Sequence, residues 1–123
     1  MANTIPFKLI SPRKVIFDGD AELVIAVTTE GEEGILPSHA PFLAALRPGV
    51  LRANVVIDGS VTRLELATSE GFMQALPDRL TVLVDEALRF EDIDVAKARE
   101  ELEAAGDQAS LDFAAAKLRL TGH

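Results

Sequence analysis

The chain has 123 residues, with 12 lysines and arginines against 20 aspartates and glutamates, and it contains no cysteine, tryptophan or tyrosine. This length suits one compact domain with a short appendage, and the net charge of −8 argues against a nucleic-acid partner and against docking on an anionic membrane surface. The 48% hydrophobic content supports a buried core, yet no apolar stretch reaches the roughly 20 residues of a membrane span. We therefore expect a soluble, cytoplasmic, acidic globular protein without disulfides or thiolate metal sites.

Residues 1–87 have the composition of a β domain, because β-branched and turn-forming residues are concentrated there. Asp18-Gly19 and Asp58-Gly59 each predict a two-residue hairpin turn, since glycine tolerates a positive φ. Pro77-Asp78 separates a further pair of strands. Turn signals at such short intervals predict about eight to ten strands in a sandwich or barrel. The strand runs we expect include 7–11, 15–17, 21–27, 51–57, 61–66, 71–76 and 80–84.

Residues 88–123 are rich in alanine, leucine and glutamate and are predicted to form a helical hairpin. Asp92 or Asp94 is suited to cap the first helix. Gly106 then interrupts the pattern, and Asp107 is placed to cap the second helix. Apolar residues recur at helical spacing, with Val95, Ala98, Leu102 and Ala105 in the first helix and Leu111, Ala115 and Leu118 on one face of the second.

Each of these predicted helices has only about 11 to 14 residues, a length that is marginal in water without tertiary contacts. The two helices must therefore pack on each other, on the β domain or on a partner. Two interpretations of the tail stay open at this point. It is either the mobile element of the protein or a fixed packing unit.

Candidate catalytic groups are scarce. His39 is the one histidine placed to act as a base, because His123 is the last residue. Ser38 and His39 are adjacent, so on a strand they point to opposite faces and cannot form the hydrogen bond that activates a nucleophile. One histidine with scattered carboxylates provides no spaced set of metal ligands, and no glycine-rich loop opens a helix. The sequence therefore predicts a protein that is not an enzyme and needs no metal or cofactor.

The segment from Glu30 to Pro41 is the clearest candidate for a binding loop. Pro37 and Pro41 stiffen it, and preordered loops lose less entropy when they bind another protein. The alternative is structural: His39 closes a turn and its ring satisfies a nearby carbonyl group.

The same segment resembles a known family. It reads Glu30-Gly-Glu-Glu-Gly-Ile-Leu-Pro-Ser-His-Ala-Pro-Phe-Leu43, and Leu46-Arg-Pro-Gly-Val50, Ser69-Glu-Gly-Phe72 and Leu80-Thr-Val-Leu-Val-Asp85 follow it. These motifs resemble the ε subunit of the bacterial F-type ATP synthase, which usually shows "EGE-GI-PGHAPL" and "SGGF" at these places. Ser38 and Glu70 stand where that family usually has glycine, and Phe42 stands in place of leucine.

The resemblance implies a flattened, roughly ten-stranded β-sandwich (1–87) followed by a two-helix hairpin (88–123). It also implies a central-stalk subunit that catalyses nothing, contacts the γ subunit and the c-ring, and couples proton translocation to ATP synthesis. Such a complex sits on the cytoplasmic face of the inner membrane, and this subunit does not insert into the bilayer. The residues that match the family's contact region for the c-ring and γ are Glu32, Pro37, Ser38, His39, Ala40 and Pro41.

In this family the tail often extends along γ toward the α and β catalytic subunits and restrains ATP hydrolysis. Here the helices are shorter than the longest tails of the family, so we expect a weakened reach. Some relatives bind ATP on the folded hairpin through a motif that corresponds to Ile93, Asp94 and Lys97. Lysine lacks the planar fork of donors that arginine offers, so we favour a structural role for these residues over a weak ATP site.

A second class of function stays open beside the stalk subunit. The chain is alternatively a stand-alone β-sandwich that binds a small ligand or another protein through the loop from Glu30 to Pro41. Co-purification with γ distinguishes the two, because only a stalk subunit travels with it.

Overall fold

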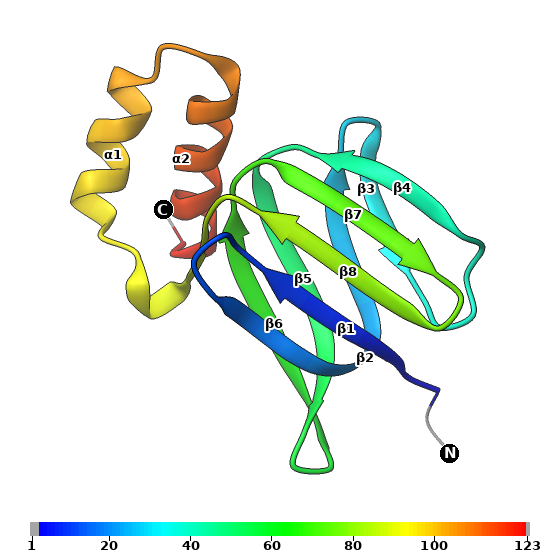
Figure 1. The fold of residues 1–123 in the computed structure, drawn as a ribbon. Helices are drawn as coiled ribbons and strands as arrows, with labels where there is room; N and C mark the ends of the chain where they lie inside the picture. The colour runs from blue at the N-terminus through cyan, green and yellow to red at the C-terminus, as the bar shows by residue number, and fades with distance from the viewer. Residues whose placement is uncertain (1–2, 123) are drawn as a thin grey trace.

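A computed structural model describes residues 3–122, so His123 lies outside the described residues. Within this range the chain forms nine strands, then a short 3-10 helix, η1 (Phe90–Asp92), and two α-helices, α1 (Val95–Ala104) and α2 (Gln108–Leu120) (Figure 1). The strands are β1 (Ile5–Ile10), β2 (Val15–Thr28), β3 (Gly31–Ile35), β4 (Phe42–Leu46), β5 (Gly49–Ile57), β6 (Ser60–Thr68), β7 (Gly71–Leu76), β8 (Arg79–Val84) and β9 (Ala87–Arg89).

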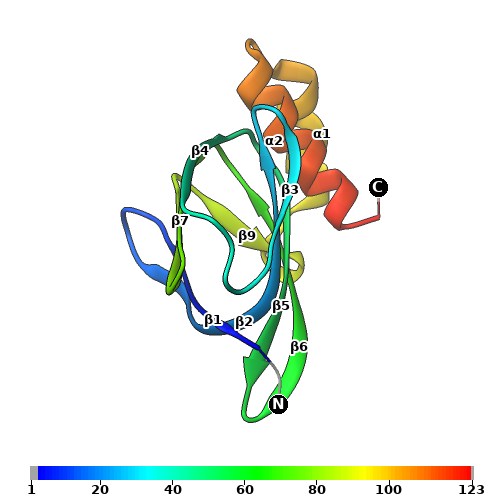
Figure 2. The ribbon, with the colours of Figure 1, turned by 90° about the vertical axis from the view of Figure 1, so that its right-hand side faces the viewer.

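The strands form a β-sandwich with a helical hairpin on one side, as the sequence predicted. One layer has the order β4-β7-β8-β1, and the other contains β3, β2, β5, β6 and β9 (Figure 2). Strand β2 joins the layers, because its first half pairs with β1 and its second half pairs with β3 and β5. Buried apolar side chains from both layers fill the space between them, among them Phe7, Leu9, Val24, Leu66, Met73 and Val82.

One predicted hairpin is wrong. Asp18-Gly19 makes no turn, because both residues lie inside the 14-residue strand β2, opposite Lys8 and Phe7 of β1. Gly19 has a packing role instead, since a Cβ there would lie 3.0 Å from Phe17 Cζ. Two expected strands are thus one, and the described residues form nine strands, within the eight to ten expected.

The other two turn predictions are confirmed. Asp58 and Gly59 have φ values of 51° and 79° and join β5 to β6, with Ile57 paired to Ser60. Positive φ at both central residues is the geometry of a type I′ turn. Pro77-Asp78 joins β7 to β8, with Leu76 paired to Arg79.

Helix α2 lies between the sandwich and α1 (Figure 1). It contacts β5 and β6, whereas α1 packs mainly on α2. Most of the residues buried here are small: Ala98 is the buried residue of α1, and α2 buries Ala114 and Ala116 together with the larger Lys117 and Leu118. Ala67 alternates with core residue Leu66 and is nonetheless fully buried, which agrees with α2 covering this outer face. Small side chains bury little apolar area, so the hairpin is held more weakly than the core.

Aspartates cap both helices, as predicted. Asp94, rather than Asp92, accepts a 3.1 Å hydrogen bond from the Lys97 amide at the start of α1. Asp107 accepts a 2.7 Å bond from the Ser110 amide at the start of α2, and bonds from the amide and hydroxyl of Ser110 lower the pKa of Asp107 below its ordinary value. Because the folded pKa is depressed, this contribution to stability exists above the ordinary carboxyl pKa and is lost as the pH falls through the lowered value.

The buried face of α2 differs from the predicted one. Leu111 is 38% exposed, whereas Ala114, Ala116, Lys117 and Leu118 are buried. The helix is covered by α1 on one side and by the sheet on another, so a single apolar stripe does not describe it. The buried Lys117 donates from Nζ to Glu101 Oε1 of α1 at 2.9 Å and lies 4.3 Å from the centre of the Phe113 ring. This ion pair joins the two helices.

Gly71 begins β7 at a point of close backbone approach. It is paired with Val84 of β8, and a Cβ at this position would overlap the carbonyl oxygen of Leu83. That oxygen belongs to a neighbouring strand and cannot move without disturbing the ladder. Glycine is therefore required at position 71.

We expect Gly71→Ala to lower the free energy of unfolding by about 2 to 4 kcal/mol, because the added methyl group meets backbone rather than a flexible side chain. Gly106→Ala is the matched control, since nothing lies within 4 Å of a Cβ there. Urea denaturation followed by circular dichroism measures both variants. Equal stability of the two would contradict the close approach.

Candidate functional site

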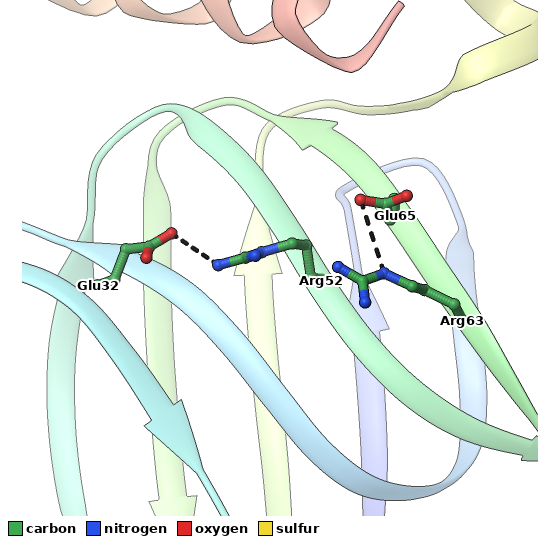
Figure 3. Close-up of polar contacts among 4 residues, drawn as sticks. All are labelled: Glu32, Arg52, Arg63 and Glu65. Carbon is green, nitrogen blue, oxygen red and sulfur yellow. Dashed lines mark hydrogen bonds and ion pairs between the residues drawn. The ribbon is translucent and has the colours of Figure 1, made fainter.

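The residues predicted to contact partners lie in two places. Glu32 is in β3, on the outer side of the second layer, where its Oε2 pairs with Arg52 Nη2 of β5 at 3.0 Å (Figure 3). The loop from Pro37 to Pro41 lies beyond the end of β3 and leads into β4. The structure therefore separates Glu32 from His39, although the sequence places them in one motif.

Glu32 lies close to the end of the helical hairpin. Glu32, Arg52 and Glu65 line a hollow of about 390 Å³ together with Arg119 and Leu120 of α2. Arg63 Nε lies 3.8 Å from Glu65 Oε2, which extends the row of alternating charges across β5 and β6 (Figure 3). These pairs are partly exposed, so each contributes little to stability and is readily exchanged for a pair with a partner.

In the loop, His39 has the geometry of a turn-closing residue. Its Nδ1 lies 3.0 Å from the Ala40 carbonyl oxygen and donates to it in the tautomer that carries this proton. The ring meets the Phe42 ring edge-on, with 6.0 Å between centroids. Nε2 is shielded and has no hydrogen-bond partner among the described residues. The exposed residues of this loop are instead Leu36, which is 59% exposed, together with Ser38, Ala40 and Pro41.

The residues of the predicted nucleotide motif have structural roles. Asp94 is the N-cap of α1, and its carboxylate accepts a hydrogen bond from the Lys97 amide. The Ile93 amide donates to the Phe90 carbonyl oxygen and closes η1. A hollow of about 360 Å³ between the helices is lined by Glu101, Ser110, Phe113 and Lys117 rather than by these residues.

The sequence analysis gave no contact role to the residues of an exposed apolar surface on the sandwich. Leu43 is 71% exposed, Phe72 is 56% exposed and Leu83 is 43% exposed. They share the outer face of the β4-β7-β8 layer, because Ala45 pairs with Phe72 and Phe72 pairs with Leu83. We call Leu43, Phe72 and Leu83 the apolar surface. The signal was available in the sequence, since these strands have apolar residues at both alternating positions.

The described residues contain neither a metal-ligand cluster nor a helix that could span a membrane. None of their histidines, aspartates and glutamates form a cluster suited to a metal ion. Among the same residues, no helix is long and apolar enough to cross a membrane.

Ser38 has a φ of 67°, a left-handed conformation that costs a residue with a Cβ about 1 kcal/mol or more. We therefore expect Ser38→Gly to raise the free energy of unfolding by about 0.5 to 1 kcal/mol, after allowance for the greater entropy of the unfolded chain. Ser60→Gly is the control, because Ser60 lies in an ordinary strand and its replacement should destabilise the protein. Destabilisation by both changes would show that Ser38 is not strained.

Comparison with known proteins identifies the family. The sequence profile of the ATP synthase Delta/Epsilon chain β-sandwich domain matches residues 4–90. The ATP synthase epsilon chain of Chromobacterium violaceum is 44% identical over 100 residues, which span 81% of this chain and 70% of that protein. The epsilon chain of Maricaulis maris is 38% identical over 123 residues, spanning 94% of this chain and 90% of that protein.

A solved structure agrees with these relatives. A chain in the structure of the Euglena gracilis mitochondrial ATP synthase, which contains OSCP, F1 and the c-ring, superimposes with a TM-score of 0.70. It is 25% identical in sequence, and the match covers 97% of this chain and 78% of that chain. Sequence and fold thus lead to one conclusion, that this chain belongs to the family of ATP synthase epsilon chains.

Proposed function

We propose that this chain is a non-catalytic subunit of the central stalk, or rotor, of an F-type ATP synthase. It links the γ subunit to the c-ring and so couples proton translocation to ATP synthesis at the cytoplasmic face of the membrane. Membership of the epsilon chain family supports this role, as does the likeness to a chain of an assembled F1 and c-ring structure. The observation that carries it is the apolar surface, which is rigid, exposed and unneeded by the core.

The apolar surface is suited to γ. Its three large side chains stand on paired strands, so the backbone that carries them loses little conformational entropy on contact. Exposed apolar residues grouped on one face are typical of protein interfaces, whereas scattered ones are not. We assign γ to this surface and leave the rim with Glu32 and the Pro37–Pro41 loop to the polar loops of the c-ring.

The contact at Glu32 is electrostatic. Its carboxylate is 60% exposed and already pairs with Arg52, so a cationic group of the ring competes with Arg52 for it. At His39 the shielded Nε2 offers no direct contact, and the exposed backbone and side chains beside it meet the partner first. In this proposal His39 holds the shape of the loop.

The hairpin is suited to a regulatory role, in which the tail leaves the sandwich, reaches the α and β subunits and restrains ATP hydrolysis. Apart from Leu118, its buried apolar residues are alanines, so in this proposal the docked and released forms differ by little free energy. Helix α2 has 13 residues and spans only about 20 Å, which supports a short reach.

The first test is binding of the full chain to the γ subunit of the same organism, measured by calorimetry. We expect Leu43→Asp and Phe72→Asp to weaken the complex at least about tenfold, because each places a carboxylate in an apolar contact. Val61→Asp is the matched control, since Val61 is 54% exposed on the far end of the β5–β6 hairpin. Absence of any complex with the unaltered chain would overturn the stalk assignment.

The second test concerns the tail. Glu101→Gln leaves a nearly buried ammonium group unpaired, so α1 amides should exchange hydrogen about tenfold faster. Lys117→Met removes the charge and keeps the volume, so it should change the exchange far less. Equal effects of the two would show that charge pairing does not hold the hairpin.

Deletion of residues 92–123 provides the functional counterpart in the assembled enzyme. We expect a modest rise in ATP hydrolysis because the reach is short. Strong activation would contradict the short reach, and unchanged hydrolysis would contradict a regulatory tail.

A further inference from the structure

A hollow lies where the sandwich meets the start of α2. It has a volume of about 520 Å³ and is walled by the β4–β5 connection, by the facing ends of β7 and β8, and by α2. Phe72 and Leu83 of the apolar surface form part of its wall, as do Pro48 and Ala109. The hollow is therefore the end of the apolar surface and is continuous with it.

The rim of this hollow is acidic. Glu70, Asp85 and Asp112 stand on it against one cation, Arg47. Glu70 and Asp85 are exposed, and Asp112 is held in place because its Oδ1 accepts a 2.8 Å hydrogen bond from Gln108 Nε2. Apolar walls with an acidic rim are suited to bind a partner segment in which an apolar side chain lies next to a positively charged one.

We propose that this hollow receives an apolar side chain of the stalk partner, and that an adjacent lysine or arginine of that partner pairs with the carboxylates of Glu70, Asp85 and Asp112. The inference rests on the proposed function, because the occupant is the protein that covers the apolar surface. It adds that this partner touches α2 as well as the sandwich.

Contact with α2 makes partner binding sensitive to the position of the tail. Ala109 and Asp112 contribute to the site only while α2 is docked on β5 and β6. A partner that uses them binds the docked form more tightly, and by linkage its binding stabilises that form. The γ contact on the sandwich and the docked hairpin then reinforce each other.

The test compares the affinity of the full chain for γ at low salt. The double variant Asp85→Lys with Asp112→Lys should bind about tenfold more weakly and should show a smaller salt dependence. The matched control is the double variant Asp78→Lys with Glu103→Lys, which makes the same change of charge at the opposite end of the β7–β8 hairpin and on α1. Both substitutions reverse an exposed charge outside the hollow, and together they should change the affinity by less than about twofold.

Ala109→Trp tests the hollow without altering charge, because an indole ring would occupy the space intended for the partner. It should weaken binding while leaving the melting temperature of the isolated chain within a few degrees. The inference would be overturned if the charge-reversed variant and Ala109→Trp both bound γ with full affinity while Phe72→Asp still lost binding. That result would leave the stalk role intact. Loss of all binding in the unaltered chain would instead overturn the stalk role itself.

Hydrogen exchange provides an independent readout. Amides of α2 should exchange more slowly when γ is added to the unaltered chain, and this protection should be reduced in the double variant. Faster hydrogen exchange in α2 upon addition of γ would mean that α2 leaves the sandwich when γ binds. That result would overturn the inference.

Discussion

The double pairing of β2 is the constraint on which the remaining architecture depends. Its first half pairs with β1 and its second half pairs with β3 and β5, so one strand belongs to both layers. Because residues alternate between faces, this register directs one face of each layer into a shared core. It also places Glu32 on the outer face of the second layer. The Pro37–Pro41 loop then connects β3 of this layer to β4 of the first layer.

The two outer faces that result are unlike each other. The β5–β6 face is covered by α2, and an ion pair joins α2 to α1. On the β4-β7-β8 face, large apolar side chains remain exposed. A sandwich whose core is complete gains nothing from exposed leucine and phenylalanine, so their presence agrees with a partner on that face. This asymmetry agrees with the proposal that the protein acts by contacts on its two outer faces.

Sequence-based predictions were confirmed where a few adjacent residues decide the local structure. The Asp58-Gly59 turn, the Pro77-Asp78 turn and the Asp94 and Asp107 caps depend on backbone geometry within four residues. Asp18-Gly19 carries the same dipeptide signal as Asp58-Gly59, yet it lies inside a strand because β1 pairs across it. The apolar surface and the buried face of α2 were missed for a related reason. Exposure depends on which neighbour covers a side chain, and the neighbours are distant in sequence.

The sequence by itself determined the family and the β-sandwich followed by two helices. These follow from motifs, periodicity and composition, which are properties of adjacent residues. Only the tertiary structure decided that Glu32 pairs with Arg52 away from His39, that Lys117 is buried against Glu101, and that the apolar surface continues into a hollow walled by α2. Each of these joins elements that are remote in the chain, and only packing of the folded layers brings them into contact.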